Sequence, residues 1–145
     1  MIKINILNDY SSVFSYQESF IKELVCKVFE NSKVTDAHLS IIFTNRTYLS
    51  DLKKKYFNVN QFTDVIAFDV SDNKDCLEAE IYISIDDVNE NSKIFKQTFN
   101  RELKRIIIHG VLHLLGFKDK TKEDIKEMRM LEENFLKNYT NKIIA

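Results

Sequence analysis

The alternation of apolar and polar residues along the chain predicts four strands. Residues 2–6 alternate between isoleucine and polar side chains, which is typical of a strand with one buried face. Runs rich in β-branched and aromatic residues predict three more strands, over residues 37–44, 63–70 and 78–85. The polar segment 71–75 separates the last two runs, so we expect these two strands to pair antiparallel across a turn.

Five other segments have apolar residues at helical spacing. The first covers residues 12–31, and Ser11 or Ser12 is its expected N-cap. Asn45 is expected to cap a short helix over residues 47–56. Three more helices are predicted over residues 88–95, 99–115 and 122–139. The order β-α-β-α-β-β-α-α-α predicts an α+β fold, a single domain in which about five helices pack on a mixed four-stranded sheet.

Composition and charge narrow the class of protein. The chain has 145 residues, of which 44% are hydrophobic, enough for the core of one domain. Its 21 basic and 22 acidic residues nearly cancel, so RNA would have to be bound by a local patch. The N-terminus lacks the apolar core of a signal peptide, and the longest uncharged run, 106–117, is too short to span a bilayer. We therefore expect a cytoplasmic protein without membrane contact.

Glycine and proline are rare in this chain, and their positions are informative. There is no proline, and the two glycines, Gly110 and Gly116, lie within ten residues of each other. Gly116 follows the end of a predicted helix, where a glycine commonly adopts the left-handed conformation and reverses the chain. A glycine inside a helix, such as Gly110, costs roughly 0.8–1.0 kcal/mol relative to alanine. We therefore expect close packing or ligand approach beside His109.

Two histidines flank Gly110 on the same predicted helix. His109 and His113 are four residues apart and project from nearly the same face, so both imidazoles can reach one metal ion. A catalytic zinc site uses three protein ligands and a water, and Asp119, three residues after the Gly116 turn, can supply the third ligand. The alternative is that the histidines are partly buried helix residues and Asp119 is a loop acid.

The same segment resembles a known family. His109 to Phe117 reads H-G-V-L-H-L-L-G-F and is similar to the H-G-x-L-H-L-x-G signature of the YbeY family, bacterial metal-dependent endoribonucleases of ribosomal RNA maturation. Residues 63–68 resemble the family segment T-D-V-L-S-F, residues 80–84 resemble its G-D-I-x-I-S strand, and residues 123–133 resemble its closing helix. The resemblance covers most of the chain from about Leu49 onward.

The resemblance implies an activity and its partners. Residues 1–145 are expected to form one YbeY-like metal-dependent hydrolase domain. Its substrate would be single-stranded regions of ribosomal RNA, notably the 3′ end of 16S rRNA, with a further role in ribosome quality control and ribosomal particles as partners. DNA is not expected as a partner. One Zn²⁺ held by His109, His113 and Asp119 would activate a water and polarise the phosphodiester.

Two departures from the family pattern leave alternatives open. The family places Asp-His where this chain has Lys118 and Asp119, so Asp119 stands in for a histidine ligand. The family also has an arginine where this chain has Phe57; Arg105 or the lysines at 53–55 can replace its charge, although ordinary ion pairing explains Arg105 equally well.

Two other functions therefore remain candidates. One is a zinc-dependent hydrolase of another bond, such as a peptide bond, which is disfavoured because Gly110 stands where the H-E-x-x-H motif has its general base. The other is a non-catalytic ribosome-assembly factor with a structural metal.

Overall fold

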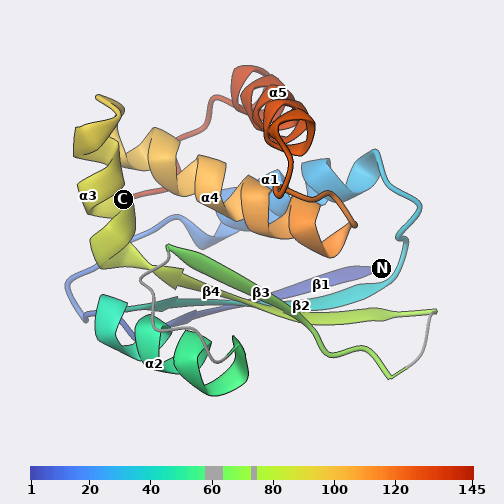
Figure 1. The fold of residues 1–145 in the computed structure, drawn as a ribbon, viewed down its shortest axis with the longest axis horizontal. Coiled ribbons are helices and arrows are strands. Elements are labelled where there is room, and N and C mark those ends of the chain that lie inside the picture. Colours follow the sequence, from blue (N-terminus) through green and yellow to red (C-terminus); the bar gives the residue numbers. More distant parts are fainter. Residues whose placement is uncertain (58–63, 73–74) are drawn as a thin grey trace.

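A computed structural model of the protein describes residues 1–57, 64–72 and 75–145, and it places most helices on one face of a four-stranded sheet (Figure 1). The α+β class and the order of elements agree with the sequence prediction. In chain order the elements are β1 (Ile2–Asn8), α1 (Glu18–Glu30), β2 (Ala37–Thr44), α2 (Arg46–Phe57), β3 (Val65–Asp69), β4 (Leu77–Ser84), α3 (Ile85–Ile94), α4 (Phe99–Leu114) and α5 (Lys122–Asn138).

The sheet is mixed, with the strand order β1-β2-β4-β3. β1 pairs parallel with β2, and β2 pairs parallel with β4. β3 pairs antiparallel with β4, which confirms the expectation for these two strands. This order leaves β3 at one edge of the sheet.

The first face of the sheet is aliphatic and is covered by helices except near the β3 edge, where Val65 and Ala67 stay partly exposed. The strand residues Leu39, Ile41, Ile81 and Ile83 are almost completely buried and belong to the main hydrophobic core. α4 packs on this face and also contacts α1, α3 and α5, so it is enclosed by protein (Figure 1). Such enclosure explains why most residues of α4 between 102 and 112 are buried.

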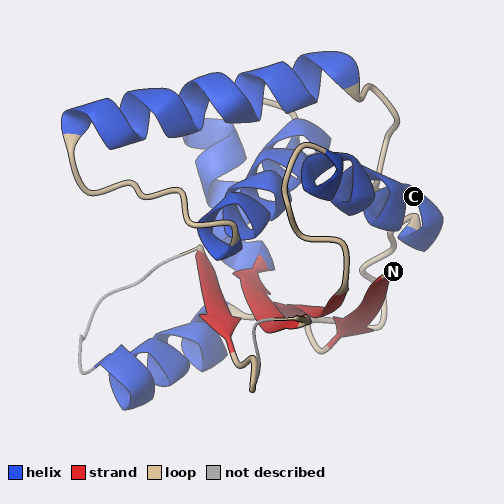
Figure 2. Ribbon diagram, turned by 90° about the vertical axis from the view of Figure 1, so that its right-hand side faces the viewer, coloured by secondary structure: helices blue, strands red, loops and turns tan. Residues whose placement is uncertain are grey.

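The second face is covered by α2 alone among the described helices (Figures 1 and 2). Leu49 is the buried residue of α2. Because neighbouring strand residues point to opposite faces, Phe68 and Tyr82 lie on this side of the sheet, opposite Ala67 and Ile81. We call the ring contacts between α2 and the sheet the aromatic layer, which consists of Tyr48, Tyr56, Phe57, Phe68 and Tyr82.

The first helix begins later than the sequence pattern indicates. α1 starts at Glu18 after Gln17, so the expectation of a helix from residue 12 capped by Ser11 or Ser12 is wrong. The Asn8 amide, at the end of β1, instead donates to the Ser11 carbonyl at 2.8 Å and holds residues 9–14 in a loop. Phe14 enters the core from this loop, with its ring 5.2 Å from the ring of Phe43. Its helical spacing was therefore coincidental.

The other helix boundaries are closer to expectation. α3 begins at Ile85, three residues before the predicted start, because Ser84 ends β4 and its hydroxyl accepts the Asp87 N–H. Asn45 caps α2 as predicted, accepting the Tyr48 N–H at 2.8 Å. Thr63 and residues 73–74 of the predicted turn lie outside the described residues. In the part of the chain that the structure describes, none of the helices combines the length and apolarity needed to cross a membrane.

Candidate metal centre

α4 brings His109 and His113 together on one helix face. The Thr98 hydroxyl accepts the Arg101 N–H and starts the helix, and the two histidines lie in its last two turns. Their Nε2 atoms are 3.0 Å apart, and the two rings meet nearly edge-on. The i, i+4 spacing therefore converges the two imidazole nitrogens on one point, as the sequence predicts.

The turn after α4 delivers Asp119 to the same point. Gly116 has φ +100°, the left-handed conformation expected from sequence. Its N–H donates to the His113 carbonyl, and the Phe117 N–H donates to the Leu112 carbonyl, a Schellman turn that reverses the chain. Asp119 Oδ2 then lies 3.3 Å from His113 Nε2 and 3.4 Å from His109 Nε2.

The three side chains fit a metal ion. Their ligand atoms all lie within 4.8 Å of one another, and the closest separations are 3.0 to 3.4 Å. A tetrahedral zinc site with bonds of ~2.0–2.1 Å has ligand atoms roughly 3.3 Å apart. Two imidazoles and a carboxylate are also a ligand set found in catalytic zinc sites. The Asp119 side chain is 44% exposed, which leaves one side of the cluster open to solvent.

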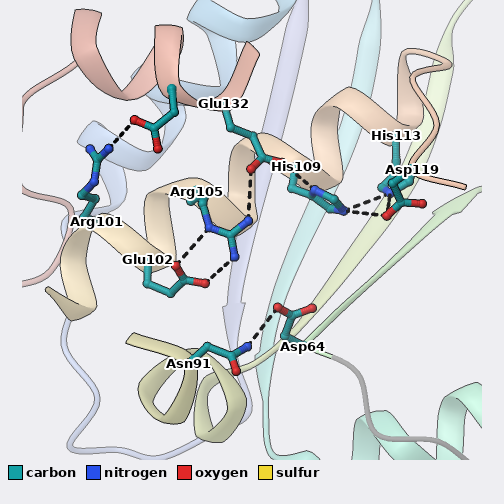
Figure 3. Close-up of polar contacts among 10 residues, drawn as sticks. Asp64, Asn91, Arg101, Glu102, Arg105, His109, His113, Asp119 and Glu132 are labelled. Carbon is teal, nitrogen blue, oxygen red and sulfur yellow. Dashed lines mark hydrogen bonds and ion pairs between the residues drawn. The ribbon is translucent and has the colours of Figure 1, made fainter. Parts of the chain in front are cut away.

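Glu132 supports this cluster from α5, and the sequence analysis missed it. Its side chain is almost fully buried, and Oε2 lies 2.6 Å from His109 Nδ1 (Figure 3). A carboxylate at this position holds the proton on Nδ1 and leaves Nε2 free to bind a metal. The buried residues of α5 follow a spacing of four: Met128, Glu132 and Leu136. An acid in the middle of this apolar series is the sequence signal that could have identified Glu132.

Arg105 lies behind the cluster, between two buried acids. Its Nε and Nη2 donate to Glu102 at 3.0 and 2.6 Å, and its Nη1 donates to Glu132 at 3.0 Å (Figure 3). Burial lowers the pKa of Arg105, but the hydrogen bonds and charges of Glu102 and Glu132 together outweigh burial and raise that pKa. The geometry favours the ion-pairing interpretation of Arg105, because three of its donor nitrogens are already engaged.

Gly110 has a packing role. A Cβ at this position would lie 3.1 Å from both Cδ1 and Cγ2 of Ile81, closer than most such contacts. The glycine thus lets α4 approach β4 closely, which confirms the expectation of close packing beside His109. The same geometry points a side chain at position 110 toward the sheet. This crowding leaves little room at position 110 for the general-base glutamate of the H-E-x-x-H motif, which further disfavours a peptidase mechanism of that kind.

The cluster lies in a cavity of about 810 Å³ that spans the β3 edge of the sheet. Lys53 and Phe57 line it from α2, and Lys120 lines it from the turn after α4. Asp64 also lines it, and its Oδ2 accepts a hydrogen bond from Asn91 at 3.3 Å (Figure 3). Burial raises the pKa of Asp64, against the opposing charges of His109 and Arg105.

Comparisons with known proteins identify the family of this chain. The family model "Endoribonuclease YbeY" matches residues 4–140. An endoribonuclease YbeY of Karelsulcia muelleri is 40% identical over 121 residues, 83% of this chain and 85% of that protein. One from Flavobacterium psychrophilum is 42% identical over 113 residues, 78% of this chain and 80% of that protein.

A solved structure has the same fold. The solution structure of a Thermotoga maritima protein superimposes with a TM-score of 0.61 at 25% identity, covering 94% of this chain and 91% of that one. The family model, the relatives and the fold lead to one assignment. The chain belongs to the YbeY family, endoribonucleases that hydrolyse phosphodiester bonds in ribosomal RNA processing.

Proposed function

We propose that residues 1–145 form one hydrolase domain that acts as a zinc-dependent, single-strand-directed endoribonuclease. Its substrates are ribosomal RNAs on ribosomal particles in the cytoplasm, including the 3′ end of 16S rRNA, and it serves in ribosome quality control. The metal ligands are His109, His113 and Asp119. The observation that carries this proposal is the convergence of three ligand atoms at coordination spacing in an open cavity, in a chain of this family.

A zinc ion there would supply Lewis-acid polarisation of a phosphoryl oxygen and a water of lowered pKa. The protein's own groups have separate tasks. Glu132 fixes the orientation of the His109 ring through Nδ1. Lys53 and Lys120 line the cavity and provide positive charge for RNA phosphates. The Asp64 carboxyl, with its raised pKa, exchanges a proton closer to neutral pH than an exposed aspartate does.

Replacing His113 tests the ligand assignment. We expect H113A to lose bound zinc in elemental analysis and to lose cleavage of a ribosomal RNA fragment that contains an unpaired segment, because two ligands hold zinc poorly. His38 is the chain's third histidine and lies exposed on β2, so H38A is the matched control and should keep both properties.

Two results would contradict the proposal. Unchanged zinc content in H113A would refute the ligand set. A zinc-loaded wild-type protein that cleaves no RNA, structured or unstructured, would refute the endoribonuclease activity and leave a structural metal as the explanation.

A further inference from the structure

The last turn of α2 presents exposed aromatic side chains beside the cavity. Tyr56 is 59% exposed and Phe57 is 49% exposed. The rings of Phe57 and Phe68 are stacked, with centroids 5.6 Å apart and planes 16° apart. Tyr56 meets Phe68 edge-on at 5.5 Å. Phe68 thus supports both rings from the sheet side, and about half of each outer side chain stays accessible to solvent.

This arrangement holds an aromatic surface at a defined position. Phe68 itself contacts Tyr82 of β4 edge-on at 5.9 Å, so the support is anchored on a central strand of the sheet. The Tyr56 and Phe57 rings are only partly buried, and each is oriented by its contact with Phe68. A preordered and accessible ring is the geometry that stacking on a planar ligand requires.

The aromatic surface is continuous with the metal cluster. Phe57 and Lys53 line the same cavity as His109, His113 and Asp119. α2 and α4 lie on opposite faces of the sheet (Figures 1 and 2). Because residues of both helices and of β3 line the same cavity, it passes around this edge strand. A ligand whose reacting group reaches the cluster can therefore extend along this path to the last turn of α2.

The charges beside the aromatic surface suit a strand of nucleic acid. Lys53 lines the cavity one turn before Phe57, and the Lys55 ammonium lies 5.4 Å from the centre of the Tyr56 ring. The cavity also contains the acids Asp64, Asp69 and Asp119, so it does not offer uniform positive charge. A few lysines combined with base stacking are typical of proteins that bind single strands, because the bases of a single strand are unpaired and can stack on aromatic rings.

We propose that Phe57, supported by Phe68, stacks on an unpaired base of the RNA whose phosphodiester reaches the metal cluster. The contact rests on the proposed endoribonuclease function and selects single strands, because paired bases keep both faces inside the duplex. It also gives Phe57 a role at the position where the family pattern has an arginine.

Two substitutions at Phe57 test the contact. Binding is measured by anisotropy on the zinc-loaded full chain, with a short single-stranded phosphorothioate RNA that resists cleavage. F57L should raise Kd about 5- to 150-fold, the effect expected for loss of one base–aromatic stack, and F57W should stay within about threefold of wild type. Zinc content should be unchanged in both. Phe95 is a similarly exposed phenylalanine that does not line this cavity, so F95L is the matched control and should bind normally.

An abasic RNA series links the loss to a base. Removing the stacked base should weaken binding to wild type and have little further effect on F57L, whereas removing distant bases should affect both proteins alike. Cleavage of unmodified RNA should show the same change in KM, with kcat nearly preserved.

Wild-type affinity in F57L, or an equal loss in F57L and F57W, would overturn the stacking role while leaving the endoribonuclease intact. Failure of the wild type to cleave any RNA would instead overturn the proposed function, and the stacking role with it.

Discussion

The two faces of the sheet differ in how completely they are covered, and this difference separates two tasks. The face beneath α4 is aliphatic, closed and overlaid by further helices. The face beneath α2 is aromatic and half open. Charged groups on a closed face can be held at fixed positions. They and their partners are buried together, so water does not compete for their hydrogen bonds. An open face keeps its side chains accessible for binding.

On the closed side of the sheet, a network of buried charges lies between α4 and α5 and ends at the candidate metal cluster. Glu102 and Glu132 are both about 1% exposed, and Arg105 bridges them. Glu132 then contacts His109, so the position of one candidate ligand depends on an ion pair between α4 and α5. Side chains on the open face do not need such partners, because they are exposed to solvent. Substitutions on the closed face should therefore cost more stability than equivalent changes on the open face.

The largest effect is expected for Arg105. R105M leaves two buried carboxylates without a cation, so we expect the free energy of unfolding to fall by about 3–5 kcal/mol. Urea denaturation at pH 7 measures it. R101M is the control on the same helix, because Arg101 pairs with Glu133 at the surface, and it should cost less than about 1 kcal/mol. Equal losses in the two variants would show that the closed face does not hold its charges as described.

A smaller effect is expected for Glu132, and on metal affinity. In E132Q an amide can donate to His109 Nδ1, which moves the ring proton to Nε2 and blocks the proposed ligand atom. Loss of such a supporting partner typically weakens metal binding by about 10- to 100-fold. Zinc titration against a chromophoric chelator measures this. The neighbouring surface variant E133Q should bind zinc normally, and unaltered affinity in E132Q would remove Glu132 from the support of the cluster.

Asp64 lies in the cavity where the two faces meet, and we expect its carboxyl to make the free energy of unfolding depend on pH. Its raised pKa means that the folded protein holds this proton more tightly than the unfolded chain. This contribution to stability is full below the unfolded pKa near 3.8 and is lost as the pH rises through the folded value. D64N should remove that loss, so its stability relative to wild type should rise between about pH 4 and pH 7. A constant difference across this range would contradict the prediction.

The smallest effect is expected in the aromatic layer and only in alkali. Burial, together with the Glu80 carboxylate, raises the pKa of Tyr82 to about 12. Tyr82 therefore contributes stability that is full below the ordinary pKa of 10 and is lost as the pH rises toward 12. Ultraviolet titration should show a tyrosine that ionises last, absent in Y82F but retained in Y48F. If Y82F titrates like wild type, the layer is more open than the structure indicates.

The sequence predicted correctly those features that depend on interactions between residues close together in the chain. The His109–His113 spacing, the left-handed Gly116 and the return to Asp119 all lie within eleven residues, and helix geometry with one turn motif relates them. The capping of α2 by Asn45 is likewise local. Phe14 shows the limit: helical spacing extended the first helix too far, because a core aromatic in a loop gives the same pattern as one on a helix.

The sequence by itself therefore determined the α+β order, the helix that carries the histidines and the turn that brings in the carboxylate. Only the tertiary structure decided that Arg105 pairs with Glu102 and Glu132, that Glu132 supports His109, and that Phe57 lines the cavity of the metal cluster. Each of these depends on which faces of distant elements meet. That choice is set by packing of the whole core and by the need to pair every buried charge, and no local pattern records it.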